Sequence, residues 1–219
     1  MTRIRSWWGW GFEDGAIDPA PLAPMVRDVL GFPLDGDLVD PVPVEQVALP
    51  EPRIEAPDGE PWSTDPRDRL SHAYGKAFRD VARALRGRID HAPDAVVFAR
   101  DERDVEAVLE WAAAQGAAVI PYGGGTSVVG GVEARVDGPA VVLDLSKMDR
   151  VLEVDPVSRA ARVQGGPAGP RLEEQLAEHG MTMRFFPQSF ELSTLGGWIA
   201  TRAGGHFATV WTHVDDVVE

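Results

Sequence analysis

Short apolar runs alternate with amphipathic stretches from His91 to the end of the chain. Apolar residues at helical spacing predict one helix that Asp101 caps and Gly116 ends, and another that stops at Gly180. The apolar runs predict strands at residues 95–99, 117–120, 140–145, 151–154 and 160–164, and residues 215–219 resemble the start of one more. This order of elements predicts an α+β fold rather than a doubly wound parallel sheet.

The first part of the chain lacks this regularity. Residues 1–66 hold 11 of the 18 prolines, and proline fixes φ and removes a backbone donor. We therefore expect an extended, irregular arm with one short helix at residues 21–30. Four apolar residues then recur at steps of 4, 3 and 4, which predicts a single helix over residues 65–88 with one apolar face: Tyr74, Phe78, Val81 and Leu85. The chain is thus divided into an arm (1–64), a helical lead-in (65–90) and a third region (91–219).

A glycine-rich stretch, IPYGGGTSVVGGV at residues 120–132, lies between two of the predicted strands and holds five glycines in nine residues. Glycine lets a ligand approach bare backbone N–H groups, and successive amides can form a nest that binds phosphate. The dinucleotide fingerprint G-x-G-x-x-G is not matched, because Val128 stands where its third glycine should be, and no Walker A lysine follows. A flexible hairpin without a ligand is the alternative.

A second glycine-containing block, PQSFELSTLGGWIATRAGG, occupies residues 187–205. Ser193 or Thr194 can cap a helix through Trp198, Ile199 and Arg202. Gly196 and Gly197 are costly in its first turn unless a ligand lies against the backbone there. Close packing of the helix on a sheet is the alternative, since it also favours glycine.

Charge and residue usage exclude several classes of function. The net charge of −14 argues against a general nucleic-acid binder, and 12 acidic against 4 basic residues in positions 1–60 place much of it on the arm. No apolar run approaches the length of a membrane span, and the first residues do not resemble a secretory signal. The absence of cysteine rules out disulfides and favours a cytoplasmic location.

Isolated residues carry less information. No cluster of His, Asp or Glu has metal-ligand spacing and no G-x-S-x-G is present, so we propose no metal site. The tryptophans at positions 7, 8 and 10 are expected to plug the surface of the main body, although aromatic groups also line pockets.

Together, PYGGGTSVVGG and, about 60 residues later, PQSFELSTLGGWIATRAGG resemble the two FAD-binding segments of the FAD-linked oxidases of the vanillyl-alcohol oxidase type. Within that family, the residues of the two segments are most similar to those of the alkyldihydroxyacetonephosphate synthase-like group. The opening WWGWG at residues 7–11 and RLSHAYGKAF at residues 69–78 also resemble segments of that group.

The resemblance implies a PCMH-type FAD-binding fold of two α+β subdomains. It also implies that FAD is held non-covalently, because the GGGTS loop contains no histidine or cysteine that could tether it. No catalytic residue is assigned. The residues expected to bind FAD are Pro121, Tyr122, Gly123, Gly124, Gly125, Thr126, Ser127, Val128, Gly130, Gly131, Pro187, Gln188, Ser189, Ser193, Thr194, Gly196, Gly197, Thr201, Arg202, Ala203 and Gly204.

The activity implied is that of a flavin-dependent oxidoreductase. It would oxidise a hydroxy acid or alcohol or, synthase-like, exchange acyl for alkyl on dihydroxyacetone phosphate. A small molecule is the expected substrate, with no nucleic acid partner and a homodimer in the full-length form. Family members continue beyond this length into a cap domain with the catalytic side chains. Residues 1–219 alone are therefore expected to be poorly soluble and to show no turnover, and an inert fragment or nucleotide-binding module is the alternative.

Overall fold

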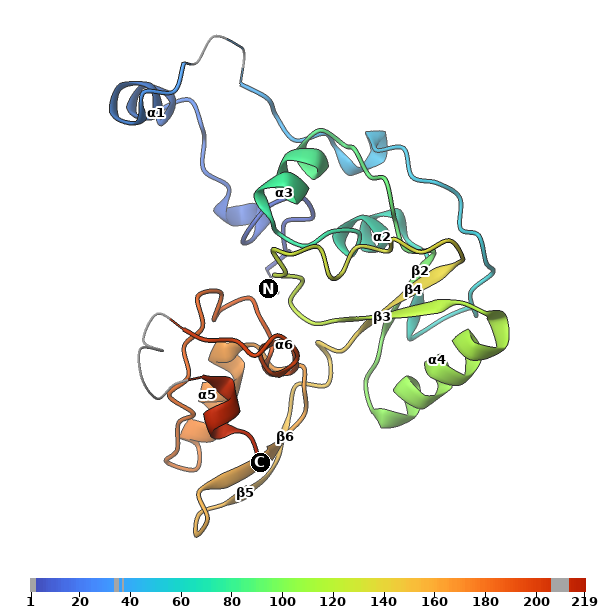
Figure 1. Ribbon diagram of the computed structural model, residues 1–219, viewed down its shortest axis with the longest axis vertical. Coiled ribbons are helices and arrows are strands. Elements are labelled where there is room, and N and C mark those ends of the chain that lie inside the picture. Colours follow the sequence, from blue (N-terminus) through green and yellow to red (C-terminus); the bar gives the residue numbers. More distant parts are fainter. Residues whose placement is uncertain (1–2, 34–35, 37, 206–212) are drawn as a thin grey trace.

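The protein contains two separate sheets, as the computed structural model in Figure 1 shows for residues 3–33, 36, 38–205 and 213–219. The first sheet has the order β1-β2-β4-β3, in which β2, β4 and β3 run parallel and β1 pairs antiparallel with β2. The second is a hairpin of β5 and β6. The strands span Trp62–Ser63, Ala95–Phe98, Ala118–Tyr122, Ala140–Asp144, Val151–Asp155 and Ala160–Val163 for β1 to β6. The predicted mixed fold of two subdomains is confirmed.

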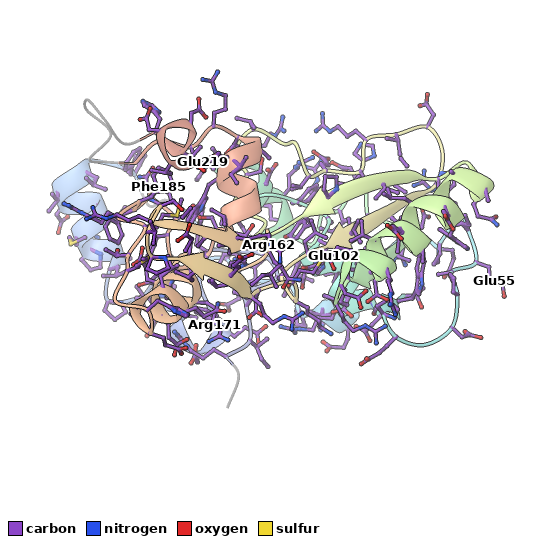
Figure 2. All side chains as sticks on the ribbon, turned by 90° about the horizontal axis from the view of Figure 1, so that it is seen from below. Glu55, Glu102, Arg162, Arg171, Phe185 and Glu219 are labelled. Carbon is purple, nitrogen blue, oxygen red and sulfur yellow. The ribbon has the colours of Figure 1, made fainter. Side chains whose placement is uncertain are left out.

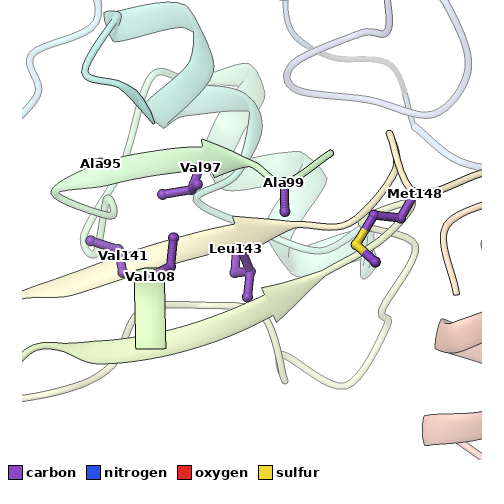
Figure 3. Close-up of a cluster of buried hydrophobic side chains, with 7 residues drawn as sticks. All are labelled: Ala95, Val97, Ala99, Val108, Val141, Leu143 and Met148. Atoms are coloured by element: carbon purple, nitrogen blue, oxygen red, sulfur yellow. The ribbon is translucent and has the colours of Figure 1, made fainter. Parts of the chain in front are cut away.

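The first subdomain packs its sheet against α4 (Glu102–Gln115). Asp101 caps this helix by accepting from the amides of Arg103 and Asp104, and Gly116 ends it at φ 64°, as predicted. Figure 3 shows the buried core between the sheet and α4, with side chains from Ala95, Val97, Ala99, Val108, Val141, Leu143 and Met148. Because parallel strands end at one edge, β3 and β4 deliver Tyr122 and Asp144 to the same place.

The second subdomain surrounds the hairpin with α5 (Gly169–Ala177), α6 (Leu195–Ala200) and a 3-10 helix, η3 (Val214–Val217). Its core is formed by Leu172, Leu176, Phe185, Leu195, Trp198 and Val214. Figure 2 shows the hairpin with Arg162 and α5 with Arg171 on one side of the molecule, and α4 with Glu102 on the other. The strand expected to begin at residues 215–219 is wrong, since this stretch starts within η3.

The arm and the helical lead-in pack against each other and against the first subdomain. α2 (Pro66–Ser71) carries Leu70, α3 (Phe78–Leu85) carries Ala84, and the segment between them carries Tyr74 toward Trp7, which is 6 % exposed. The expected tryptophan plug is thus confirmed for Trp7. The arm also holds the expected short helix, α1 (Ala23–Leu30), and two 3-10 helices, η1 (Glu13–Gly15) and η2 (Val44–Gln46).

The single helix predicted over residues 65–88 is wrong. The chain breaks between α2 and α3, where a Cβ on Gly75 would lie 2.1 Å from the carbonyl oxygen of Ser127. The Lys76 amide donates to that same oxygen at 2.7 Å. The predicted apolar face also fails in α3, because Phe78 is 88 % exposed while Asp80 is buried. Tertiary contact with the glycine-rich loop overrides the local periodicity here.

Candidate functional site

The two blocks singled out in the sequence lie in direct contact. A Cβ on Gly123 would lie 2.2 Å from the Thr194 Oγ1, and one on Gly124 would lie 1.8 Å from the carbonyl oxygen of Leu192. Gly125 has φ +65°, and its Cβ would lie 1.9 Å from the hydroxyl of Tyr122. The three successive glycines are therefore required by close approach, and no larger side chain fits at these positions.

The glycine-rich loop presents a row of backbone donors. None of the N–H groups of residues 123–127 donates a hydrogen bond to another atom of the described chain. The loop is not a hairpin, because the strands that flank it, β3 and β4, run parallel. Adjacent unpaired amides of this kind form a site for an anion, and phosphate is a common occupant.

The second block is held in place by its own hydrogen bonds. Thr194 is the N-cap of α6 and accepts from the Gly197 amide, whereas Ser193 accepts from the Trp198 indole at 2.6 Å and donates to the Ser189 carbonyl at 2.8 Å. A Cβ on Gly196 would lie 2.9 Å from the Gly165 carbonyl oxygen. Close packing therefore accounts for Gly196.

Two adjoining cavities lie along the junction of the blocks. One, of about 440 Å³, is lined by Tyr122, Gly123, Gly124 and Thr194 among the predicted residues, and the other, of about 780 Å³, by Thr126, Val128, Gln188 and Ser189. Lys76 and Leu192 line both. The remaining predicted residues line neither cavity: Pro121, Gly125, Ser127, Gly130, Gly131, Pro187, Ser193, Gly196, Gly197, Thr201, Arg202, Ala203 and Gly204.

Among these residues, the side chains of Thr201 and Arg202 have partners within the second subdomain. Arg202 forms an exposed ion pair with Asp215, with Nε 2.8 Å from Oδ2, and the Thr201 hydroxyl donates to the Gly197 carbonyl at 2.8 Å. Their polar groups are thus engaged within the second subdomain.

Sequence reasoning missed the charged and histidine side chains that line the smaller cavity: Arg5, Asp68, His72, Lys76, Asp144, Asp149 and Arg171. The one sequence signal for any of these residues was the resemblance of WWGWG and RLSHAYGKAF to family segments. Arg5 lies just before WWGWG, and RLSHAYGKAF contains His72 and Lys76. No spacing rule connects residues so far apart in the chain. Trp10, which is 47 % exposed, lines the larger cavity, so the pocket alternative holds for this tryptophan.

Burial shapes the charge of this cavity. Burial lowers the pKa of the Arg5 guanidinium. Burial also lowers the pKa of the Lys76 ammonium, to about 8, and the like charge of the nearby Arg5 adds to this shift. Burial also raises the pKa of the Tyr122 hydroxyl, which donates to the Ser71 carbonyl at 3.0 Å. The tyrosine is therefore a neutral structural donor under the start of the glycine-rich loop.

Among the described residues, no group of three or more His, Cys, Asp or Glu side chains is arranged to hold a metal ion. None of the helices in the described ranges is long and apolar enough to cross a membrane. Two adjoining cavities with unpaired amides and the cations Arg5 and Lys76 at their walls fit a ligand that carries phosphate, with its uncharged part in the neighbouring space.

Comparison with known proteins points to one cofactor. Residues 93–219 match the family model that describes an FAD binding domain. The alkyldihydroxyacetonephosphate synthase of Trypanosoma brucei brucei is 37 % identical over 153 residues, which cover 68 % of this chain and 25 % of the relative. A D-2-hydroxyglutarate dehydrogenase of Xanthomonas citri pv. viticola is 34 % identical over 145 residues, which cover 65 % and 28 %.

A solved alkyldihydroxyacetonephosphate synthase superposes on the chain with a TM-score of 0.84 and 29 % identity, covering 97 % of this chain and 46 % of that one. This match includes nearly all of the arm. The chain spans about half of that structure and about a quarter of the two relatives.

Proposed function

Because this chain belongs to the FAD-linked oxidase family with a PCMH-type FAD-binding domain, we propose that the junction of its two glycine blocks is the site that holds FAD. FAD is the cofactor of the family, and the family is enzymatic. The amides of residues 123–127 bind the pyrophosphate, and the cavity lined by Thr126, Gln188 and Ser189 receives the flavin side of the molecule.

One observation carries this assignment. Five successive N–H groups have no acceptor in the described chain, and they follow directly from the carboxyl end of β3. Gly125 is buried and the other four residues are partly buried, and an amide withdrawn from water without an acceptor is costly, so a ligand that accepts several of these hydrogen bonds is favoured. Side chains at Gly123 and Gly124 would separate the loop from the second block and open this site.

The protein residues bind and orient the cofactor, and FAD, when bound, supplies the electron-accepting chemistry. We propose that the complete protein either oxidises a small hydroxy acid or alcohol, or exchanges acyl for alkyl on dihydroxyacetone phosphate. The named relatives represent both chemistries. The expected homodimer stays a prediction, which light scattering of the full-length form tests.

Titration with FAD tests the cofactor assignment. The purified protein should take up one FAD per chain, seen as a change in flavin fluorescence and a shift in the absorption bands. A protein that is colourless after incubation with excess FAD and removal of the free FAD would contradict the cofactor assignment. If that protein still binds ADP, a nucleotide-binding module without turnover would be favoured.

A screen of the loaded full-length protein separates the two chemistries. Bleaching of the flavin band by D-2-hydroxy acids indicates a dehydrogenase, whereas incorporation of a labelled fatty alcohol into an acylated ketose phosphate indicates a synthase.

A further inference from the structure

The start of the arm forms a fixed loop at the wall of the smaller cavity. The Ser6 amide donates to the Gly11 carbonyl at 3.1 Å, and the Glu13 amide donates to the Ile4 carbonyl at 2.9 Å. Gly11 makes this turn with φ +80°, and the buried Trp7 side chain anchors it. The arm therefore delivers Arg5 to one defined position.

Arg5 bridges the two glycine blocks without an acidic partner. Its Nη2 donates to the Gly124 carbonyl at 3.1 Å and its Nη1 is 3.4 Å from the Leu192 carbonyl. Its Nε is buried and has no hydrogen-bond partner among the described residues.

Lys76 adds a second cation to the same cavity. The side chain is buried, with 5 % exposed, and its Nζ donates to the Trp7 carbonyl at 3.3 Å. No carboxylate of the described chain lies within ion-pair distance of this ammonium. The depressed pKa, about 8, agrees with a charge that the protein itself leaves uncompensated.

The acidic side chains of the cavity have other partners. Asp144 contacts His72 at 2.9 Å and accepts from the Ser146 amide at 2.7 Å. Asp68 accepts from the Ser63 hydroxyl at 2.6 Å, and Asp149 lies 3.5 Å from the Nε of Arg171, a further cation that lines the cavity. Lys76 is buried and Arg5 is partly buried, and two such cations in one cavity without a paired carboxylate are unfavourable unless an anion compensates them.

We propose that Arg5 and Lys76 bind the pyrophosphate of FAD, so that the arm and the helical lead-in contribute a cationic wall to the cofactor site beside the amides of residues 123–127. This inference rests on the proposed function and deepens it. Each phosphate of the pyrophosphate bridge carries one negative charge, which matches the two cations. The arm and the helical lead-in, rather than the two glycine blocks alone, then determine the affinity for the phosphates.

Binding measurements on Arg5→Ala and Lys76→Met test the proposal with FAD, inorganic pyrophosphate and riboflavin as probes. Each variant should bind FAD and pyrophosphate about 10- to 100-fold more weakly than the parent, as expected for loss of a charge-assisted hydrogen bond. Riboflavin has no phosphate, and its affinity should not change in Arg5→Ala, because Arg5 lines only the smaller cavity, whereas Lys76 lines both. Arg5→Lys should recover part of the loss for FAD.

Arg3→Ala is the matched control, because Arg3 lies on the same arm but pairs with the exposed Asp14 at 2.8 Å. This variant should bind all three probes like the parent. Parent-like FAD and pyrophosphate affinities in both test variants would overturn the proposal, as would an equal loss for riboflavin in Arg5→Ala.

Binding of the same probes to the parent protein distinguishes failure of the proposed FAD site from failure of the proposed phosphate contacts of Arg5 and Lys76. Failure to bind FAD or riboflavin, with pyrophosphate binding that depends on Arg5 and Lys76, would sink the proposed function and support the phosphate site. Failure to bind any of the probes would overturn both.

Discussion

The Nε2 of His72 lies 2.9 Å from the Oδ2 of Asp144, with both side chains buried at the carboxyl edge of the first sheet. The other ring nitrogen is 2.7 Å from the Asp68 carbonyl oxygen. Both ring nitrogens are thus within hydrogen-bond distance of an oxygen. The pair ties α2 to the end of β4 beneath the proposed cofactor site.

Removal of this carboxylate should destabilise the fold. Asp144→Ala leaves His72 and the Ser146 amide without their buried acceptor, so we expect the free energy of unfolding to fall by about 3 kcal/mol. Urea unfolding followed by circular dichroism measures the change. Glu106→Ala, at an exposed position of α4, is the control and should stay near the parent value. A loss in Asp144→Ala no larger than in the control would contradict the structural role.

Two glycines of the same loop should respond differently to alanine. Gly124→Ala places a methyl group 1.8 Å from the Leu192 carbonyl oxygen, whereas the nearest atom to a Cβ on Gly131 is 3.9 Å away. We expect Gly124→Ala to lose FAD affinity and about 1–3 kcal/mol of stability, as overpacking commonly costs. Gly131→Ala should retain both, although the sequence places it in the site. Fluorescence titration and thermal melts check this, and equal effects at both positions would contradict the model of a tight junction.

Lys76→Met should stabilise the protein while it weakens FAD binding. The folded state lowers the pKa of this amine from 10.5 to about 8, which corresponds to about 3 kcal/mol of destabilisation. The folded protein holds the proton less tightly than the unfolded chain, so the penalty is complete below pH 8 and disappears as pH rises to about 10.5.

The stability of the parent, relative to Lys76→Met, should therefore rise across that pH window. Arg5 opposes the ammonium charge and Asp80 favours it, and both stay in place in the variant. Urea unfolding without FAD between pH 7 and 10.5 provides the measurement. If Lys76→Met is less stable than the parent at pH 7, the folded protein stabilises the charge of the Lys76 ammonium, and the prediction is wrong.

FAD should leave the protein when it unfolds. No histidine or cysteine occurs in residues 121–131, so the loop offers no side chain of the kind that tethers flavin in related enzymes. After precipitation by heat or acid, the flavin absorbance should appear in the supernatant. Yellow colour that stays with the pellet would indicate a covalent bond elsewhere in the chain.

Local signals predicted the elements that local chemistry determines. Asp101 and Gly116 bound α4 because a cap and a left-handed glycine act within one turn of the helix. The family resemblance marked both glycine blocks as FAD-binding segments, but it did not predict that Gly123 and Gly124 pack against Thr194 and Leu192. α3 could not be read correctly, because Asp80 is buried through its ion pair with Arg83 at 2.9 Å, and apolar periodicity gives no sign of this.

Arg5 could not be found for another reason. Its role depends on contacts with Gly124 and Leu192, which are 119 and 187 positions away. An arginine in an irregular, proline-rich arm has no periodicity or spacing that would mark it. Such a residue is visible only after the fold brings these segments together.

This separation in sequence affects how the protein folds. Bringing Arg5 to Leu192 closes a loop of nearly the whole chain, and loop closure of this length is slow and entropically costly compared with contacts inside one subdomain. During synthesis, the sheet that contains β2, β3 and β4 can form before Leu192 has left the ribosome. The arm must then remain available until the second block emerges, so the bridge between the blocks is one of the last contacts to form.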